Sequence, residues 1–224
     1  MEALCLRGVT KVYRTPVESV VALRDVSLSI DVGDMLCVIG PSGSGKTTLL
    51  KVSAGFLRPD MGVVTLMGEE IYKLPLRRLH SVRNRLVGFV FQEDMLIDSL
   101  TVIENVELPL IARGVRGSVR RRMAMEALDR LGISKLSNRK VDQISGGERR
   151  RVCLAMGVAH RPKVLFADEP TSNLDTESAM AVLEELKALN RDGTTVILAT
   201  HDSLVAKNVP KTIELRDGKI VREL

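Results

Sequence analysis

The stretch that most constrains this fold is Gly40-Pro41-Ser42-Gly43-Ser44-Gly45-Lys46-Thr47-Thr48. It follows an apolar run, residues 35–39, and precedes a segment with helical character that starts at Thr48. A strand, a glycine-rich turn and a helix start form the frame of a phosphate-binding loop. The glycines let backbone N–H groups close on a polyphosphate, and the helix N-terminus adds positive potential. The alternative is a glycine-rich turn that binds nothing. Because every position of the pattern is filled, we expect a nucleotide here, with Lys46 at its β- and γ-phosphates.

A second candidate element ends another apolar run. Residues 164–167 are apolar, and Asp168 and Glu169 follow them. Carboxylates at the carboxyl end of a strand lie where open α/β sheets bind ligands. We expect Asp168 and the Thr47 hydroxyl to hold Mg²⁺, and Glu169 to polarise a water that attacks the γ-phosphate. The alternative, a pair of solvated acids, loses weight beside a phosphate loop.

A third element consists of small and polar residues before a helix. Its sequence is Ile144-Ser145-Gly146-Gly147-Glu148. The first N–H groups of a helix have no partner within the helix, and the helix dipole favours an anion there. We therefore expect a second phosphate-binding element at this point.

The first part of the chain is predicted to consist mainly of strands. Alternating and continuous apolar patterns indicate strands over residues 3–13, 20–30, 63–67, 70–72 and 87–91. The first two are expected to pair in an antiparallel sheet, and the last is expected to be buried.

The pattern becomes helical from Gln92 to about Arg161, with apolar residues at helical spacing. Strand character returns at 164–167 and 194–199, on either side of a helix over about 176–189. A hairpin around Asp217-Gly218 is expected near the end. We predict one α/β domain, residues 1–224. It would have a core lobe of about 1–91 and 162–224 and a helical subdomain of about 92–161.

Composition narrows the class of protein. A chain of 224 residues with 45% hydrophobic residues can bury a sizeable core, and its longest apolar runs fall short of the ~20 residues that cross a bilayer. No leader segment is expected, because Glu2 and Arg7 interrupt the first apolar stretch. The 3 cysteines have apolar neighbours, which favours small core residues in a reducing compartment over a disulfide or metal framework.

The net charge of +5 invites a nucleic-acid or anionic-surface interpretation. Aromatic residues are only 3% and tryptophan is absent, so a base-stacking platform is not expected. The basic residues cluster at 116–122 and 149–151, and a solvated helical face is the more frequent meaning of such runs. No nucleic-acid partner is therefore expected.

Several further residues, together with these three elements, form a characteristic order of motifs along the chain. Gln92 lies between the phosphate loop and Ser145-Gly146-Gly147-Glu148, while Ser172-Asn173-Leu174-Asp175 and His201 follow Asp168-Glu169. This order and spacing, over essentially the whole chain, resemble the ATP-binding-cassette (ABC) ATPases. The resemblance implies a P-loop NTPase core of the ABC type, with an N-terminal antiparallel β subdomain and an inserted α-helical subdomain.

The resemblance also implies an assembly and residue roles. In the family, two subunits bind two ATP molecules head to tail, each between the phosphate loop of one subunit and the Ser145-Gly146-Gly147 element of the other. Gln92 resembles the residue that senses Mg²⁺ and the attacking water, and His201 the histidine that contacts the γ-phosphate. Asp175 matches the acid that joins the two sites, and Tyr13 the aromatic residue against adenine.

One departure from the family pattern concerns the residues around Ser145. The commonest family sequence has Leu and Gln where this chain has Ile144 and Glu148. Ile keeps an apolar anchor, and an acid in the first helical turn suits the helix dipole. We expect the Ser145 element to remain functional, and we expect any effect of these two exchanges to be on the rate of ATP turnover.

A closer resemblance is to the lipoprotein-release and macrolide-export ATPases, on the segments 89–92, 100–110 and 171–175. It implies an ATPase subunit at the cytoplasmic face of the membrane that drives a separately encoded transmembrane permease. A regulatory ABC ATPase that signals in cell division without transport is the alternative. A nucleic-acid-handling ABC ATPase is disfavoured, because it would carry a long coiled-coil insertion or a second cassette.

Overall fold

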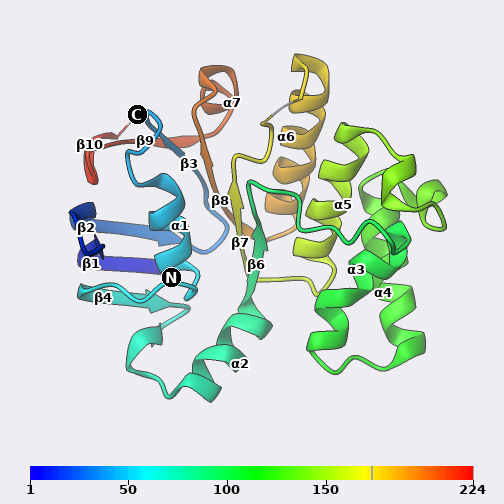
Figure 1. The fold of residues 1–224 in the computed structure, drawn as a ribbon, viewed down its shortest axis with the longest axis horizontal. Helices are drawn as coiled ribbons and strands as arrows, with labels where there is room; N and C mark the ends of the chain where they lie inside the picture. The colour runs from blue at the N-terminus through cyan, green and yellow to red at the C-terminus, as the bar shows by residue number, and fades with distance from the viewer. Residues whose placement is uncertain (173, 224) are drawn as a thin grey trace.

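The computed structural model describes residues 1–172 and 174–223. Figure 1 shows the arrangement of its strands and helices. The strands are β1 (Glu2–Arg14), β2 (Ser19–Asp31), β3 (Met35–Ile39), β4 (Met61–Leu66), β5 (Glu69–Glu70), β6 (Val87–Val90), β7 (Val164–Asp168), β8 (Thr195–Thr200), β9 (Lys211–Arg216) and β10 (Lys219–Glu223). The α-helices are α1 (Lys46–Ser53), α2 (Leu76–Leu86), α3 (Val102–Ala112), α4 (Gly117–Arg130), α5 (Gly146–Val158), α6 (Thr176–Arg191) and α7 (Ser203–Lys207).

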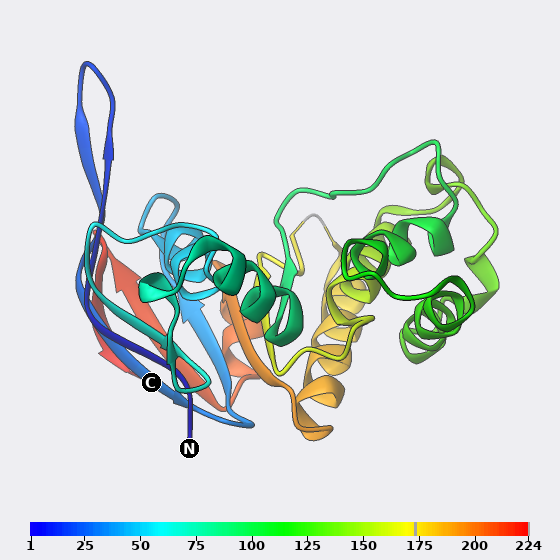
Figure 2. The same ribbon diagram turned by 90° about the horizontal axis from the view of Figure 1, so that it is seen from below.

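Two sheets form the larger part of the molecule. The central sheet has the order β10-β9-β3-β8-β7-β6, in which only the β9–β10 pair is antiparallel. The second sheet, β2-β1-β4-β5, is antiparallel throughout. Figure 2 shows the hairpin between β1 and β2 projecting from the rest of the molecule.

Alternation along the central strands explains the two hydrophobic cores. In β3, Leu36 and Val38 face a core shared with α1 and the antiparallel sheet, while Met35 and Cys37 face a core shared with α3, α4, α5 and α6. Since successive side chains of a strand point to opposite faces, a sheet covered on both faces needs apolar residues at every position. The continuous apolar runs of β3 and β7 meet this need.

Helices α3, α4 and α5 lie together at the end of the molecule opposite the antiparallel sheet (Figure 1). Helix α3 begins with a capping box, in which Thr101 and Glu104 exchange hydrogen bonds. The chain turns at Gly114, whose φ of 71° is a left-handed value, before α4 begins. The three helices fall within the stretch from Gln92 to about Arg161 for which a helical pattern is predicted, but the first of them begins only at Val102.

The strand expected over residues 70–72 is wrong beyond Glu70. Strand β5 ends at Glu70, and Ile71–Lys73 form a 3₁₀ turn in place of the predicted strand over 70–72. The hydroxyl oxygen of Tyr72 lies 2.6 Å from the carbonyl oxygens of both Val52 and Leu57, and its single O–H group is shared between these two acceptors, which draws the chain toward the end of α1. Helix α2 then occupies a stretch for which no element was predicted.

His160, which follows α5, is a histidine whose surroundings shift its pKa. Burial, with a smaller contribution from the charge of Arg113, lowers the pKa of His160 to about 4. The Val87 carbonyl lies 3.0 Å from its Nε2 and opposes the shift. Because the unfolded chain binds a proton near pH 6.5 and the folded chain binds it only near pH 4, acid favours unfolding in this window.

We therefore expect the free energy of unfolding to fall between about pH 6.5 and pH 4, by at most about 1.4 kcal/mol per pH unit from this residue. Urea titrations at pH 7, 6 and 5 on the wild type and on His160→Gln measure it, since Gln keeps a hydrogen-bond donor but does not titrate. Parallel pH dependences in the two proteins would contradict the assignment.

Candidate functional site

A cavity of about 560 Å³ lies beside the phosphate loop. The β1–β2 hairpin forms one wall, the loop and α1 form the floor, and residues after β6, β7 and β8 close the far side. The carboxyl ends of parallel strands meet at one edge of the sheet, which is where α/β folds bind ligands. Its lining includes the following residues proposed from the sequence: Tyr13, Ser42, Gly43, Ser44, Gly45, Lys46, Thr47, Thr48, Gln92, Glu169 and His201.

The path of the loop depends on glycine at two positions. A Cβ atom on Gly45, where φ is 105°, would lie 2.3 Å from the carbonyl oxygen of Ala22. A Cβ atom on Gly40 would lie 2.1 Å from the carbonyl oxygen of Leu215. The loop backbone is therefore packed against β2 and β9, and only glycine allows this approach. Helix α1 begins directly after the loop, at Lys46, and presents its N-terminus to the cavity.

The Lys46 side chain is buried inside the loop. Its Nζ donates to the carbonyl oxygens of Gly40 at 2.8 Å and Pro41 at 3.1 Å, and lies 3.9 Å from Oε1 of Glu169. These contacts hold a positive charge next to the cavity. A phosphate in the cavity would be within reach of this charge and of the helix N-terminus.

Asp168 lies at the end of β7 and is 2% exposed. Burial raises its pKa, and the Thr47 side chain opposes the rise. Its Oδ1 atom has no hydrogen-bond partner among the described residues, although a buried polar atom normally has one. A buried carboxylate oxygen without a partner, next to a threonine hydroxyl, fits a hard cation such as Mg²⁺. Among the described residues no group of three or more His, Cys, Asp or Glu could hold a metal.

Glu169 is buried and has a strained backbone. Its φ of 45° lies in the left-handed region, which is uncommon for a residue other than glycine and is found at functional sites. Its Oε2 atom lies 3.0 Å from Nδ1 of His201 and accepts a hydrogen bond from the His201 backbone at 3.4 Å. The strands β7 and β8 are neighbours in the sheet, which brings Glu169 and His201 together.

The remaining proposed residues lie away from this cavity. Ser145 caps α5, and Oε2 of Glu148 accepts from the Ser145 backbone at 2.7 Å and from its hydroxyl at 2.9 Å. These hydrogen bonds hold the pKa of Glu148 below its usual range. Asp175 caps α6 through Ser178 and is exposed. Asn173 lies outside the described residues.

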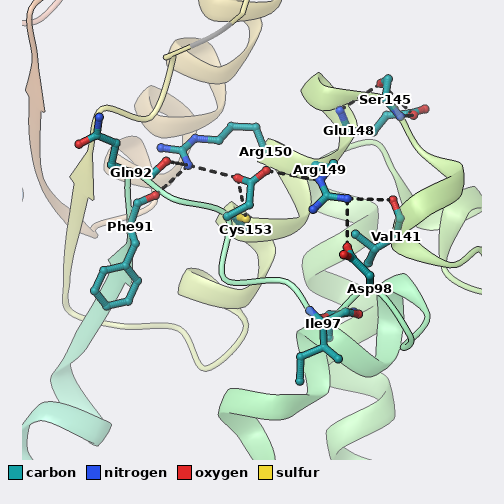
Figure 3. Close-up of polar contacts among 12 residues, drawn as sticks. Phe91, Gln92, Ile97, Asp98, Val141, Ser145, Glu148, Arg149, Arg150 and Cys153 are labelled. Carbon is teal, nitrogen blue, oxygen red and sulfur yellow. Dashed lines mark hydrogen bonds and ion pairs between the residues drawn. The ribbon is translucent and has the colours of Figure 1, made fainter.

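One buried residue of this region was not singled out from the sequence. Arg150, in α5, is 3% exposed, and its guanidinium group is directed at the backbone of Phe91 and Gln92 (Figure 3). It belongs to the run 149–151, which was interpreted as a solvated face. The available signal was helical spacing, because Arg150, Leu154 and Val158 lie on one buried face.

Comparison with known sequences decides the family. The sequence model of the family described as "ABC transporter" matches residues 23–172, well over half of the chain. The chain belongs to the ABC transporter family. The resemblance drawn from the motif order is thereby confirmed.

Relatives with similar length and with additional domains both occur in the family. The chain is 39% identical over 218 residues to the uncharacterized ABC transporter ATP-binding protein YvrO of Bacillus subtilis, covering 97% of this chain and 95% of YvrO. It is 41% identical to the macrolide export ATP-binding/permease protein MacB of Rhodopseudomonas palustris, covering 97% of this chain and 33% of MacB.

Solved structures confirm the predicted fold class. The dimeric structure of the cassette MJ0796 in a post-hydrolysis state with ADP and Pi has a TM-score of 0.91 and 38% sequence identity. The match covers 99% of this chain and 97% of that chain, as it does for a second dimeric structure of MJ0796. The chain is an ABC ATPase cassette, which binds and hydrolyses ATP. In the part of the chain that the structure describes, no helix has the length and apolar character needed to cross a membrane.

Proposed function

We propose that two copies of this chain close around two ATP molecules and thereby drive a separate transmembrane permease. The observation that carries the proposal is the separation of the candidate residues into two sets. One set lines the cavity, while Ser145-Gly146-Gly147 lies at an exposed helix start elsewhere on the same chain. A second copy, placed head to tail, supplies the missing set to each cavity. The dimeric MJ0796 structures support this arrangement.

Within one copy, different residues of the cavity bind the phosphates and the adenine of ATP. Lys46 and the amides of the loop hold the phosphates, and Tyr13 offers its ring to adenine. Tyr13 is 42% exposed, and its hydroxyl lies 3.4 Å from Oγ1 of Thr48, so the ring stands at the rim of the cavity beside α1. Aromatic rings stack on flat groups with little dependence on their hydrogen-bonding edges.

Thr47, Gln92 and Asp168 are the residues that would hold Mg²⁺. When bound, Mg²⁺ neutralises charge that develops on the phosphate oxygens. The unpartnered Oδ1 of Asp168 supports this part of the proposal.

Glu169 is the proposed general base. Its carboxylate accepts the proton of the attacking water, and Gln92, which follows the neighbouring strand β6 and lines the same cavity, orients that water. His201 is the proposed contact of the γ-phosphate, and the 3.0 Å distance between its Nδ1 and Oε2 of Glu169 supports a shared target for the two side chains. Asp175, at the start of α6, connects the two sites of the dimer.

The ATPase core and the helical part are proposed to meet at a docking groove for the permease. A second cavity, of about 270 Å³, lies between the core strand β6 and helices α2, α3 and α5. Phe56, Phe89 and Phe91 make edge or tilted ring contacts there, with Glu93 and Met95 at the side of the Gln92 segment. An apolar floor with a polar rim is typical of the core of a protein interface.

The segment 95–97 supports this groove in part. Met95 is 60% exposed and Ile97 is 45% exposed, whereas Leu96 is partly buried against the core of the helical region. Leu96 therefore contributes to packing and not to the groove. Met95 is the residue of this segment that lines the cavity.

The relatives support a transport role for the complex. MacB is named a macrolide export ATP-binding/permease protein, and YvrO an ABC transporter ATP-binding protein. We propose an exporter or lipoprotein-release type of transporter, with this chain at the cytoplasmic face of the membrane. The regulatory alternative is not favoured. We further propose that residues 1–91 and 162–224 form the core lobe and residues 92–161 the helical lobe.

Met95→Ala tests the docking groove. Because Met95 is mostly exposed, we expect the melting temperature and ATP binding to stay close to those of the wild type, while copurification with membranes is lost. Thermal unfolding, nucleotide titration and membrane fractionation of the host measure these properties. Met61→Ala is the matched control, since Met61 is 67% exposed on β4, away from the groove. Unaltered membrane association of Met95→Ala would remove the argument for this docking place.

A further inference from the structure

Arg150 joins two segments of the proposed catalytic site through backbone carbonyl groups. Its Nη1 donates to the carbonyl oxygens of Phe91 at 2.8 Å and Gln92 at 3.3 Å (Figure 3). On the other side of the guanidinium group, Nε and Nη2 donate to three successive carbonyl oxygens, those of Asp168, Glu169 and Pro170, at 2.7–3.0 Å. One buried side chain therefore contacts the backbone of Gln92 and the backbone of Glu169 at the same time.

The donor count of this side chain matches its surroundings. A guanidinium group carries five N–H donors in a rigid plane, and five carbonyl oxygens surround Arg150. Lysine has three donors on one atom and cannot face two segments at once. A shorter donor would leave buried carbonyl groups without partners.

The turn that Arg150 contacts is the strained one. Glu169 has a left-handed backbone conformation, and such strain persists only where the surrounding structure holds the residue in place. The hydrogen bonds of Arg150 to the carbonyl oxygens before, at and after Glu169 perform this task. The direction of the Glu169 side chain depends on the same backbone.

The charge partner of Arg150 connects this link to the second cavity. Oδ1 of Asp94 lies 3.6 Å from Nη1 of Arg150, and Asp94 also faces Arg149 at 3.5 Å and the thiol of Cys153 at 3.5 Å. The residues on either side of Asp94, Glu93 and Met95, line the groove, as does Cys153. A displacement of this segment would therefore reach Arg150 directly.

We propose that Arg150 is a positioning residue that fixes Gln92 relative to Glu169, and that Asp94 makes this link sensitive to the groove. The inference rests on the proposed roles of Gln92 and Glu169 in hydrolysis. Arg150 is not among the described residues that line the cavity, so its effect is on geometry alone. Loss of the link lowers the rate of hydrolysis and leaves ATP binding unchanged.

Arg150→Lys is the first test, because it keeps the charge and most of the volume. We expect kcat to fall ~10-fold or more, since small misplacements of reacting groups cost this much, while KM for ATP changes less than ~2-fold. A purely structural role would instead lower the melting temperature and the active fraction, and kcat per active site, counted by ATP titration, would equal that of the wild type. Equal kcat in Arg150→Lys and wild type would overturn the proposal.

A double-mutant cycle with Gln92→Ala shows through which residue Arg150 acts. We expect Gln92→Ala to lower kcat and Arg150→Lys to cost less in that background than in the wild type, the remaining loss acting through Glu169. If Gln92→Ala leaves kcat unchanged, the role of Gln92 in the proposed function is wrong, and this inference fails with it. If Gln92→Ala lowers kcat and Arg150→Lys costs the same in both backgrounds, the inference alone is wrong.

Asp94→Asn is a second test of the proposal, which applies even if Arg150→Lys does not fold. The Asp94 side chain is 32% exposed, so the variant is expected to fold, and loss of its charge leaves Arg150 less restrained. We expect a ~5-fold lower kcat with unchanged KM, the scale of one lost hydrogen bond of about 1 kcal/mol. Asp98→Asn is the matched control, because Asp98 pairs with Arg149 and not with Arg150. Equal kcat values in the two variants would contradict the link.

Discussion

Glu169→Gln is expected to bind ATP and to hydrolyse it at least ~10²-fold more slowly than the wild type, the scale of losing a general base. The amide keeps the volume of the side chain, and its oxygen can still accept the hydrogen bonds from His201 that Oε2 accepts. The amide cannot take a proton from water. Binding should survive because Lys46 and the loop are unchanged. Phosphate release at saturating ATP measures the rate.

The same variant tests the assembly. Because hydrolysis is what reopens the dimer in the proposed cycle, slow hydrolysis should make Glu169→Gln accumulate as a dimer with ATP and remain monomeric with ADP. Light scattering distinguishes the two states. Glu184→Gln is the control, since Glu184 is an acid of α6 that faces solvent and pairs with Lys187. Near-normal turnover, or a monomer at saturating ATP, would contradict the role of Glu169.

The parts of the site that could be predicted from the sequence are those whose position is determined by residues close by in the chain. The phosphate loop needs glycine at positions such as Gly45, where a Cβ atom would meet the neighbouring backbone, and this need is visible in the sequence pattern. Asp168 and Glu169 follow an apolar strand, so their place at the sheet edge follows from the strand alone. Their approach to Gln92 and His201 required the order of strands, which the motif order supplied.

Arg150 shows why the rest was missed. Three consecutive arginines suggest a solvated face, but successive residues of a helix point about 100° apart. Arg150 therefore points inward with Leu154, while Arg149 stays half-buried beside Asp94 and Asp98. Nothing in the local sequence says that five backbone carbonyl oxygens lie around that position. They come from segments about 20 and 60 residues away along the chain.

Helix α2 was missed for a related reason. It carries arginine at 77, 78, 83 and 85, and its few apolar residues are spread over its length. Leu79 and Val82 nevertheless lie three residues apart on one face and are both buried. The 3₁₀ turn before it depends on the contact of Tyr72 with Val52 and Leu57, a tertiary cause that a local pattern cannot show.

Lys46→Ala should weaken ATP binding by about 10- to 100-fold, the scale of losing a hydrogen bond to a charged group. The Nζ group is the positive charge that lies deepest among the cavity residues described, held by the carbonyl oxygens of Gly40 and Pro41. It faces the position where the proposed γ-phosphate approaches Glu169, 3.9 Å from Oε1 of that residue. Alanine removes this charge and suits the first position of a helix.

Two measurements separate binding from folding in this variant. A nucleotide titration gives the affinity for ATP, and thermal unfolding without nucleotide gives the stability, which we expect to change little because the lost hydrogen bonds belong to a loop at the edge of the cavity. Lys219→Ala is the control for net charge, since Lys219 is exposed on β10. The loss should be larger for ATP than for ADP, because the charge lies nearest the terminal phosphate in the proposed arrangement. Unchanged affinity for both nucleotides would mean that the loop does not hold the phosphates.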